Sequence, residues 1–352
     1  MKHSHILINT ISLLAAIAAF YMVGREIHTY NITWATAGEI LQDFQWSTLL
    51  LALGATAIGY LVLATYDLLA IYHLGYKIPW HKTLLVSFLG FAVSNNAGHA
   101  IVTGGAIRFR YYSALGLNAA SIGKIIVFSS STYLLGAVTL LCAAYFFLPQ
   151  DELNHPELLG GHLSWFIWGI LLLLVIYWSL ILSGRHRLQW KKINIGLPPT
   201  RITAVQTFAG ICDLLFAGVV LYCLLYPATQ MHFMWFFTVY ILAQLIGLFS
   251  QVPGGIGIFE SAFLLLVGDA HDHQIILIAL LTYRLMYFLL PLLIALVIFA
   301  ITQHQSLREN WQKIPGVIRM QNIVATTSIF LHRRLPVFLS LLAVLAGGIL
   351  LL

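Results

Sequence analysis

Long apolar runs alternate with short polar connections along almost the whole chain. A helix that crosses a bilayer needs about 20 mostly apolar residues. Runs of about this length predict seven spanning helices, at residues 6–23, 48–74, 122–148, 163–183, 202–226, 274–302 and 335–352. The first run also resembles a signal peptide, because Ala16-Ile17-Ala18 is similar to a cleavage site. We favour an uncleaved first helix, since similar helices follow it throughout.

Two further apolar stretches, residues 83–116 and 232–268, are interrupted in the middle. The first interruption reads Ser94-Asn95-Asn96-Ala97-Gly98 and is followed by Thr103-Gly104-Gly105, and the second reads Gln251-Val252-Pro253-Gly254-Gly255-Ile256-Gly257. Such breaks free backbone groups that lipid cannot satisfy, so they are expected to be buried in protein or to line a cavity. We interpret both stretches as re-entrant helical hairpins that enter and leave the membrane on one side.

The composition supports an all-α polytopic membrane protein. Of the 352 residues, 60% are hydrophobic and only 9% are charged, against about 25% charged in an ordinary soluble domain. A soluble enzyme, a disordered protein and a disulfide scaffold are therefore excluded. The net charge of +6 comes from basic residues in short loops, where they indicate membrane topology.

The charged loops predict which side each connection faces. With the N-terminus in the cytoplasm, the inner loops hold 13 of the 18 basic residues, namely Lys2, Lys77, Lys82, Arg185, Arg187, Lys191, Lys192, Arg201, Arg308, Lys313, Arg319, Arg333 and Arg334. The outer loops hold 8 of the 12 acidic residues. Reading either broken stretch as a full span would destroy this asymmetry, so the positive-inside rule favours both hairpins together.

The order span, span, hairpin, span occurs twice, first starting inside and then starting outside. This order predicts two inverted-topology repeats, at 1–150 and 151–302, an arrangement of many secondary transporters. At an offset of 150 residues, the ungapped segment 104–140 has 11 identities with 254–290, including Gly104-Gly105 with Gly254-Gly255 and Thr132-Tyr133 with Thr282-Tyr283. Residues 303–334 are expected to form a cytosolic or interfacial segment, and 335–352 the start of a further, truncated transmembrane helix.

Six ionisable residues fall inside the predicted spans and hairpins: Asp67, Arg108, Arg110, Asp213, Glu260 and Arg284. Each charge at mid-bilayer costs roughly 2.5–3.5 kcal/mol on insertion scales, so these residues must pair or face a wet cavity. One interpretation is structural ion pairs between helices. The other is a mid-membrane site, to which Asn95, Asn96, Gly254, Gly255 and Tyr283 would also contribute.

The mixed signs of these charges suggest a particular kind of ligand. Guanidinium groups bind phosphate in a forked geometry, and carboxylates hold an ammonium group. At the offset of 150, Arg110 is equivalent to Glu260, so the two hairpins carry opposite charges. A phospholipid headgroup with both a phosphate and an amine would fit. We expect no cofactor and no metal site; Asp269-Ala270-His271-Asp272-His273 lacks helical ligand spacing.

Three segments carry a family resemblance: residues 104–110, 253–260 and 283–291. They resemble the membrane region of the lysylphosphatidylglycerol synthetase/flippase family, the multiple peptide resistance factors, which also has membrane-only relatives. The resemblance implies a bacterial inner-membrane flippase that moves lysyl- or alanyl-phosphatidylglycerol outward and confers resistance to cationic antimicrobial peptides. It carries over Asp67, Arg108, Asp213 and Glu260 as functional positions.

The resemblance leaves alternatives open. In the full-length family a cytosolic C-terminal domain makes the lipid from aminoacyl-tRNA, and the chain would be the membrane part of such a transferase. It would instead be a stand-alone transporter of another phospholipid or polyprenyl-linked lipid, or a non-transporting scaffold. A homodimer is also left open.

Overall fold

The computed structural model describes residue 38 and residues 44–97, 100–148, 162–184, 187–190, 193–250, 252–268 and 272–312. The predicted spans 6–23 and 335–352, and most of the segment 303–334, lie outside these residues. The described part of the chain is almost entirely helical, which confirms the all-α class.

Five of the described helical segments are long and apolar enough to cross a membrane. They are α3 (Trp46–His73), α6 (Ala119–Phe146), α8 (His162–Leu182), α9 (Thr200–Thr229) and a last segment built from α12 (His273–Tyr283), the π-helical turn η4 (Arg284–Leu289) and α13 (Leu290–Gln312). These are the five predicted spans that fall within the described residues. The helix α13 continues past the predicted end of its span at residue 302.

Each interrupted stretch forms two short helices. The first consists of α4 (Trp80–Ala97) and α5 (Ala100–Ala114), and the second of α10 (Phe233–Phe249), the 3-10 turn η2 (Pro253–Gly255) and α11 (Ile258–Val267). The helices of each pair pack against each other. The predicted breaks are therefore present, whereas re-entry into the membrane remains a prediction.

The first break is shorter than the sequence suggested. Gly104 and Gly105 lie inside α5, although Gly254 and Gly255 lie in the second break, each with a φ of 61°. A Cβ on Gly104 would lie 3.0 Å from the carbonyl oxygen of Gly90 and 3.0 Å from the Cβ of Ser94. Gly104 therefore serves the close contact of α5 with α4 and not a chain break.

A small antiparallel β-hairpin, which the apolar pattern did not predict, lies in the connection between α8 and α9. Its strands are β1 (Arg187–Trp190) and β2 (Ile193–Gly196). It falls in the most basic predicted inner loop.

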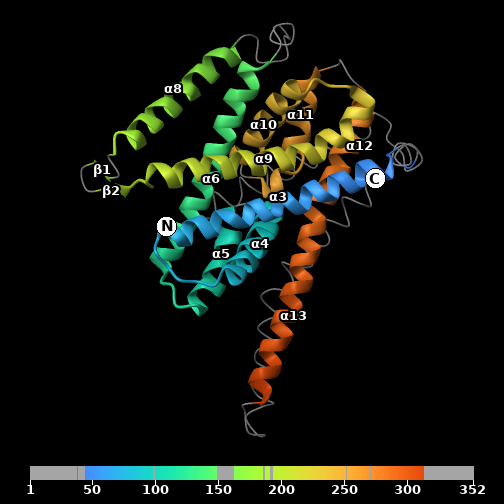
Figure 1. Ribbon diagram of the computed structural model, residues 1–352. Helices are drawn as coiled ribbons and strands as arrows, with labels where there is room; N and C mark the ends of the chain where they lie inside the picture. Colours follow the sequence, from blue (N-terminus) through green and yellow to red (C-terminus); the bar gives the residue numbers. More distant parts are fainter. Residues whose placement is uncertain are drawn as a thin grey trace, which may run out of the picture.

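The helices are arranged around α3 and α9, which lie side by side across the middle of the molecule (Figure 1). The pair α4–α5 lies on one side of them, and α10, α11 and α12 lie on the other. The packing is reciprocal: α4 contacts α13, while α10 contacts α6; α3 contacts α6, while α9 contacts α12. Two copies related by a two-fold axis would pack in this way; the inverted relation itself stays a prediction.

The positions of the elements give the repeat length. Trp46 and Thr200, which begin α3 and α9, are 154 residues apart, and so are Ala119 and His273, which begin α6 and α12. The identities at an offset of 150 are thus displaced by four residues, about one helical turn. Such a displacement keeps apolar faces aligned, which is why the sequence match looked acceptable at that offset.

Close backbone contact holds the centre together. Gly136 of α6 and Gly210 of α9 face each other, and a Cβ on either would overlap the backbone of the other helix. Small residues at such crossings let spanning helices pack by van der Waals contact, because lipid supplies no hydrophobic drive between helices.

Candidate functional site

The first buried ion pair joins Asp67 of α3 to Arg108 of α5. Nε and Nη2 of Arg108 donate to the two carboxylate oxygens of Asp67 at 2.8 and 3.0 Å. The hydroxyls of Tyr112 and Ser129 also donate to this carboxylate, at 2.9 and 2.8 Å. We call these four residues the first cluster. Both charged side chains are buried, with exposed fractions of 0% and 3%.

Local packing explains why the Arg108 guanidinium fits between the helices. A Cβ on Gly90 would lie 3.3 Å from Nη1 of Arg108, and one on Gly104 would lie 3.1 Å from it. The two glycines thus leave the space that the guanidinium fills. Its other support is the ring of Phe91, whose centre lies 4.5 Å from Cζ of Arg108. Bidentate pairing and a cation–π contact together compensate the desolvation of this charge.

The second buried ion pair joins Glu260 of α11 to Arg284 of η4, with Nε of Arg284 donating to Oε1 at 2.5 Å. The other guanidinium nitrogens donate to the backbone carbonyls of Gly254 and Gly255 at 2.5 and 3.1 Å. Oε2 of Glu260 accepts the backbone N–H of Gly257 at 2.7 Å. We call these five residues the second cluster. Both partners therefore satisfy backbone groups that the helix break at Pro253–Gly255 leaves free.

The two breaks meet beside the second cluster. A Cβ on Gly254 would lie 3.0 Å from the carbonyl oxygen of Asn96 and 3.3 Å from that of Asn95. Nδ2 of Asn96 donates to the carbonyl of Phe288 in η4 at 3.0 Å and to that of Ala92 at 2.8 Å. The end of α4 thus touches both η2 and η4. In a spanning helix, irregular backbone is stable when it is buried in protein in this way.

Asp213 of α9 is a third buried carboxyl group, 3% exposed. Its oxygens accept hydrogen bonds from the hydroxyls of Tyr66 at 2.9 Å and Tyr287 at 3.4 Å. No ion pair of Asp213 is found among the described residues. Tyr66 and Asp67 are neighbours on α3, so α3 connects Asp213 to the first cluster directly.

Two predicted site residues lie apart from these clusters. Arg110 is exposed, and its Cζ lies 5.1 Å from the ring centre of Phe299 in α13. The hydroxyl of Tyr283 lies 3.0 Å from that of Tyr240 in α10. Arg110 and Glu260 therefore occupy very different surroundings, because the structural repeat is four residues longer than the offset that paired them.

The sequence analysis missed the hydroxyl donors: Tyr66, Tyr112, Ser129 and Tyr287. Tyr112 is four residues after Arg108 and so lies on the same helical face, a spacing that could have identified it. Ser129 carried no signal, since α6 has several serines and threonines.

Comparison with known proteins places the chain in a family. The model of the lysylphosphatidylglycerol synthase transmembrane region matches residues 9–295. The Synechocystis protein named "Uncharacterized protein slr0712" is 32% identical over 83% of this chain and 90% of its own length. The inner membrane protein YbhN of Escherichia coli is 28% identical over 80% of this chain and 88% of its own length.

Longer proteins match as well. The phosphatidylglycerol lysyltransferase of Bacillus subtilis is 27% identical over 86% of this chain, but the match covers only 35% of that enzyme. The similarity thus concerns the membrane part of the lysyltransferases and almost the full length of the two shorter relatives. The chain belongs to the lysylphosphatidylglycerol synthase transmembrane-region family.

Proposed function

We propose that this protein translocates a phospholipid whose headgroup carries both a phosphate and an amine, such as lysyl- or alanyl-phosphatidylglycerol, from the inner to the outer leaflet of a bacterial inner membrane. The observation that carries the proposal is the pair of broken helices whose ends meet beside buried, paired charges. Broken helices of this kind form the midplane sites of many secondary transporters.

The charge pairing favours a substrate with both signs. Arg108 is held by Asp67, so a phosphate reaches that guanidinium only by displacing the carboxylate. A lipid with phosphate alone would leave Asp67 buried without a cation, which is costly. A headgroup that also carries an ammonium group compensates both partners of the opened pair. The same reasoning applies to Glu260 and Arg284.

The proposed direction of transport follows from the charge asymmetry of the loops. The cytoplasmic side is assigned to the β1–β2 connection and to the basic segment after Ile301, as the positive-inside rule requires. Resistance to cationic peptides would follow from outward movement of a positively charged lipid.

A reconstituted translocation assay tests this function. The purified chain is placed in vesicles with fluorescently labelled lysyl-phosphatidylglycerol or unmodified phosphatidylglycerol, and an impermeant quencher reports the exposed fraction with time. We expect faster exposure of the lysyl lipid than in protein-free vesicles. The double variant Asp67→Asn with Arg108→Gln should slow this movement about tenfold or more, as expected for loss of a charged contact.

The matched control is Thr56→Val. Thr56 is a buried polar residue of α3 whose hydroxyl bonds only to the carbonyl of Ala52 in the same helix, at 2.9 Å. This variant should transport like the parent protein. A rate equal to that of protein-free vesicles for both lipids, with correctly assembled protein, would reject the proposed function.

The internal satisfaction of both ion pairs also favours a second candidate, a non-transporting scaffold. In a scaffold the two pairs only join helices, so the neutral double variant would retain assembly and every other property of the parent. Loss of lipid movement with intact assembly would exclude the scaffold.

A further inference from the structure

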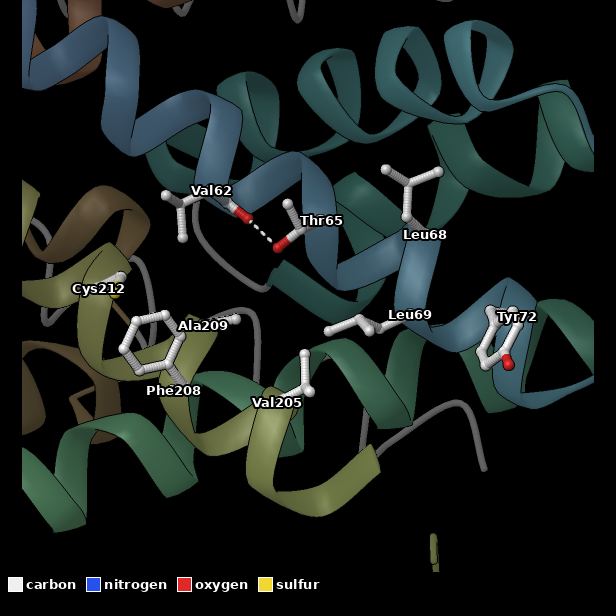
Figure 2. Close-up of a pocket in the computed structure, with 9 residues that line it drawn as sticks. All are labelled: Val62, Thr65, Leu68, Leu69, Tyr72, Val205, Phe208, Ala209 and Cys212. Atoms are coloured by element: carbon white, nitrogen blue, oxygen red, sulfur yellow. Dashed lines mark hydrogen bonds between the residues drawn. The ribbon is translucent and has the colours of Figure 1, made fainter. Parts of the chain in front are cut away.

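An apolar groove of about 580 Å³ lies between α3 and α9, away from the buried clusters (Figure 2). Val62, Leu69 and Tyr72 form its α3 wall, and Val205, Phe208 and Cys212 form its α9 wall. Its volume is in the range of small-molecule sites, about 300–1,000 Å³. The groove uses the C-terminal half of α3 and the N-terminal half of α9.

The two faces of α3 differ sharply in chemistry. Tyr66 and Asp67 point into the protein and bear the buried hydrogen bonds, whereas Val62 and Leu69 line the groove. The one hydroxyl within the groove, that of Thr65, donates to the carbonyl of Val62 at 2.6 Å (Figure 2). The groove thus presents no polar group that requires a polar ligand.

A basic residue continues the groove at one end. Arg201 lies one helical turn before Val205 and 11 residues before Cys212, so the three share a face of α9. Its side chain is exposed. Among the described residues, no ion pair or hydrogen bond engages the Arg201 guanidinium. Tyr72, which is 75% exposed, lies on α3 near the same end of the groove.

We propose that this groove holds one acyl chain of an anionic phospholipid, with the lipid phosphate at Arg201. Two observations select this occupant. Both walls belong to helices that are long and apolar enough to span a membrane, and the free guanidinium marks the end where a phosphate would lie. Arginine binds phosphate through paired donors. By the charge asymmetry of the loops, this end faces the inner leaflet.

The inference deepens the proposed function, because it rests on phospholipid as the substrate and identifies where such a lipid waits in the inner leaflet. The headgroup would then lie on the outer side of the α3–α9 wall that carries Asp67 and Asp213 on its inner side.

Photolabelling of the full chain tests the groove. The protein is reconstituted in phosphatidylcholine vesicles with a trace of phosphatidylglycerol that carries a diazirine on one acyl chain, and labelled peptides are quantified by mass spectrometry. We expect labelling to concentrate on residues 62–72 and 205–212. Val205→Trp, which fills the groove, should lower that labelling severalfold. Arg201→Gln should weaken retention about tenfold, the effect of losing one charged contact.

Two controls define the result. Val175→Trp makes the same substitution on α8, where Val175 is 53% exposed against 44% for Val205, and it should leave groove labelling unchanged. Diacylglycerol with the same diazirine has no phosphate, so Arg201→Gln should not affect its labelling.

Equal labelling of the groove and of the apolar α8 surface, or groove labelling that Val205→Trp does not lower, would overturn the proposal. So would an equal effect of Arg201→Gln on both probes. Labelling requires no movement between leaflets. A protein that labels as expected but moves no lipid would reject only the proposed function, and the reverse result would reject only the groove.

Discussion

The two buried ion pairs are held in different ways. In the first cluster, the Asp67 carboxylate receives donors from the side chains of Arg108, Tyr112 and Ser129, which lie on two other helices, α5 and α6. In the second cluster, Arg284 binds two backbone carbonyls as well as Glu260, and Glu260 binds a backbone N–H. The first cluster therefore joins continuous helices, whereas the second closes a chain break.

The difference teaches how one fold stabilises two kinds of buried charge. An interhelical pair depends on both charges, because removing either leaves the other uncompensated. A pair that also satisfies free backbone groups depends on the geometry of its guanidinium fork as much as on charge. The exposed fractions agree with this distinction: 3% for the Arg108 side chain and 15% for that of Arg284.

Removal of Arg108 should have the largest effect on stability. Arg108→Ala leaves Asp67 buried without a cation, which should cost about 3–5 kcal/mol of unfolding free energy. Denaturant titration in mixed micelles, followed by tryptophan fluorescence, measures the change. Asp67→Asn combined with Arg108→Gln should cost clearly less, because no uncompensated charge remains. If the single variant unfolds at the same midpoint as the parent, the first cluster is not a tie between helices.

Arg284→Lys should show the role of the fork in the second cluster. Lysine keeps the charge but cannot reach Glu260 and both carbonyls of Gly254 and Gly255 together. We expect a loss of about 1.5–3 kcal/mol, the value of hydrogen bonds to charged groups. Hydrogen exchange of the backbone should rise around residues 252–260. The matched change Arg108→Lys tests the same loss in a cluster that engages side chains, and there exchange should not rise at the break.

The glycines of the second break should separate backbone strain from contact. Gly254→Ala places a Cβ at a φ of 61° and 3.0 Å from the carbonyl oxygen of Asn96. The left-handed conformation alone costs about 1–2 kcal/mol. Gly255→Ala has the same φ but its nearest contact is 3.5 Å away, so it should cost less. Gly123→Ala, inside α6 with no atom within 4 Å, should be neutral or slightly stabilising in the same unfolding measurement.

Much of the fold was accessible from the sequence, because apolar length determines where spanning helices form. The predicted span 202–226 and the helix Thr200–Thr229 agree within three residues, and both broken stretches were found from their polar and glycine residues. The β1–β2 hairpin was missed because a short pairing inside a polar loop has no apolar periodicity. The repeat offset was four residues too short, since apolar helices match almost equally well one turn out of register.

The candidate site was predicted as a set of residues but not as a set of pairs. Burial of a charge in a span requires a partner, so Asp67, Arg108, Glu260 and Arg284 could all be identified. Which cation meets which anion depends on how α5 packs on α3 and how η4 packs on η2, and these are tertiary contacts. The exposed position of Arg110 was unpredictable for the same reason, since residues 108 and 110 lie on different faces of one helix.

Asp213 offers the sharpest and smallest test, because it is a buried carboxyl with tyrosine donors and no ion pair among the described residues. Asparagine has the same shape and keeps an oxygen that accepts the Tyr66 hydroxyl, which lies at 2.9 Å. If the large costs at the two clusters come from breaking charge pairs, Asp213→Asn should change the unfolding free energy by less than about 1 kcal/mol, the value of one ordinary hydrogen bond.

Asp213→Ala is the contrasting variant for that measurement. It removes both acceptors and leaves the hydroxyls of Tyr66 and Tyr287 unsatisfied, so it should cost about 1–3 kcal/mol. A loss for Asp213→Asn as large as that for Arg108→Ala would show that Asp213 is paired with a charge beyond the described residues. A neutral stability effect together with reduced lipid movement would instead assign Asp213 a part in transport, since its charge would then matter to function but not to folding.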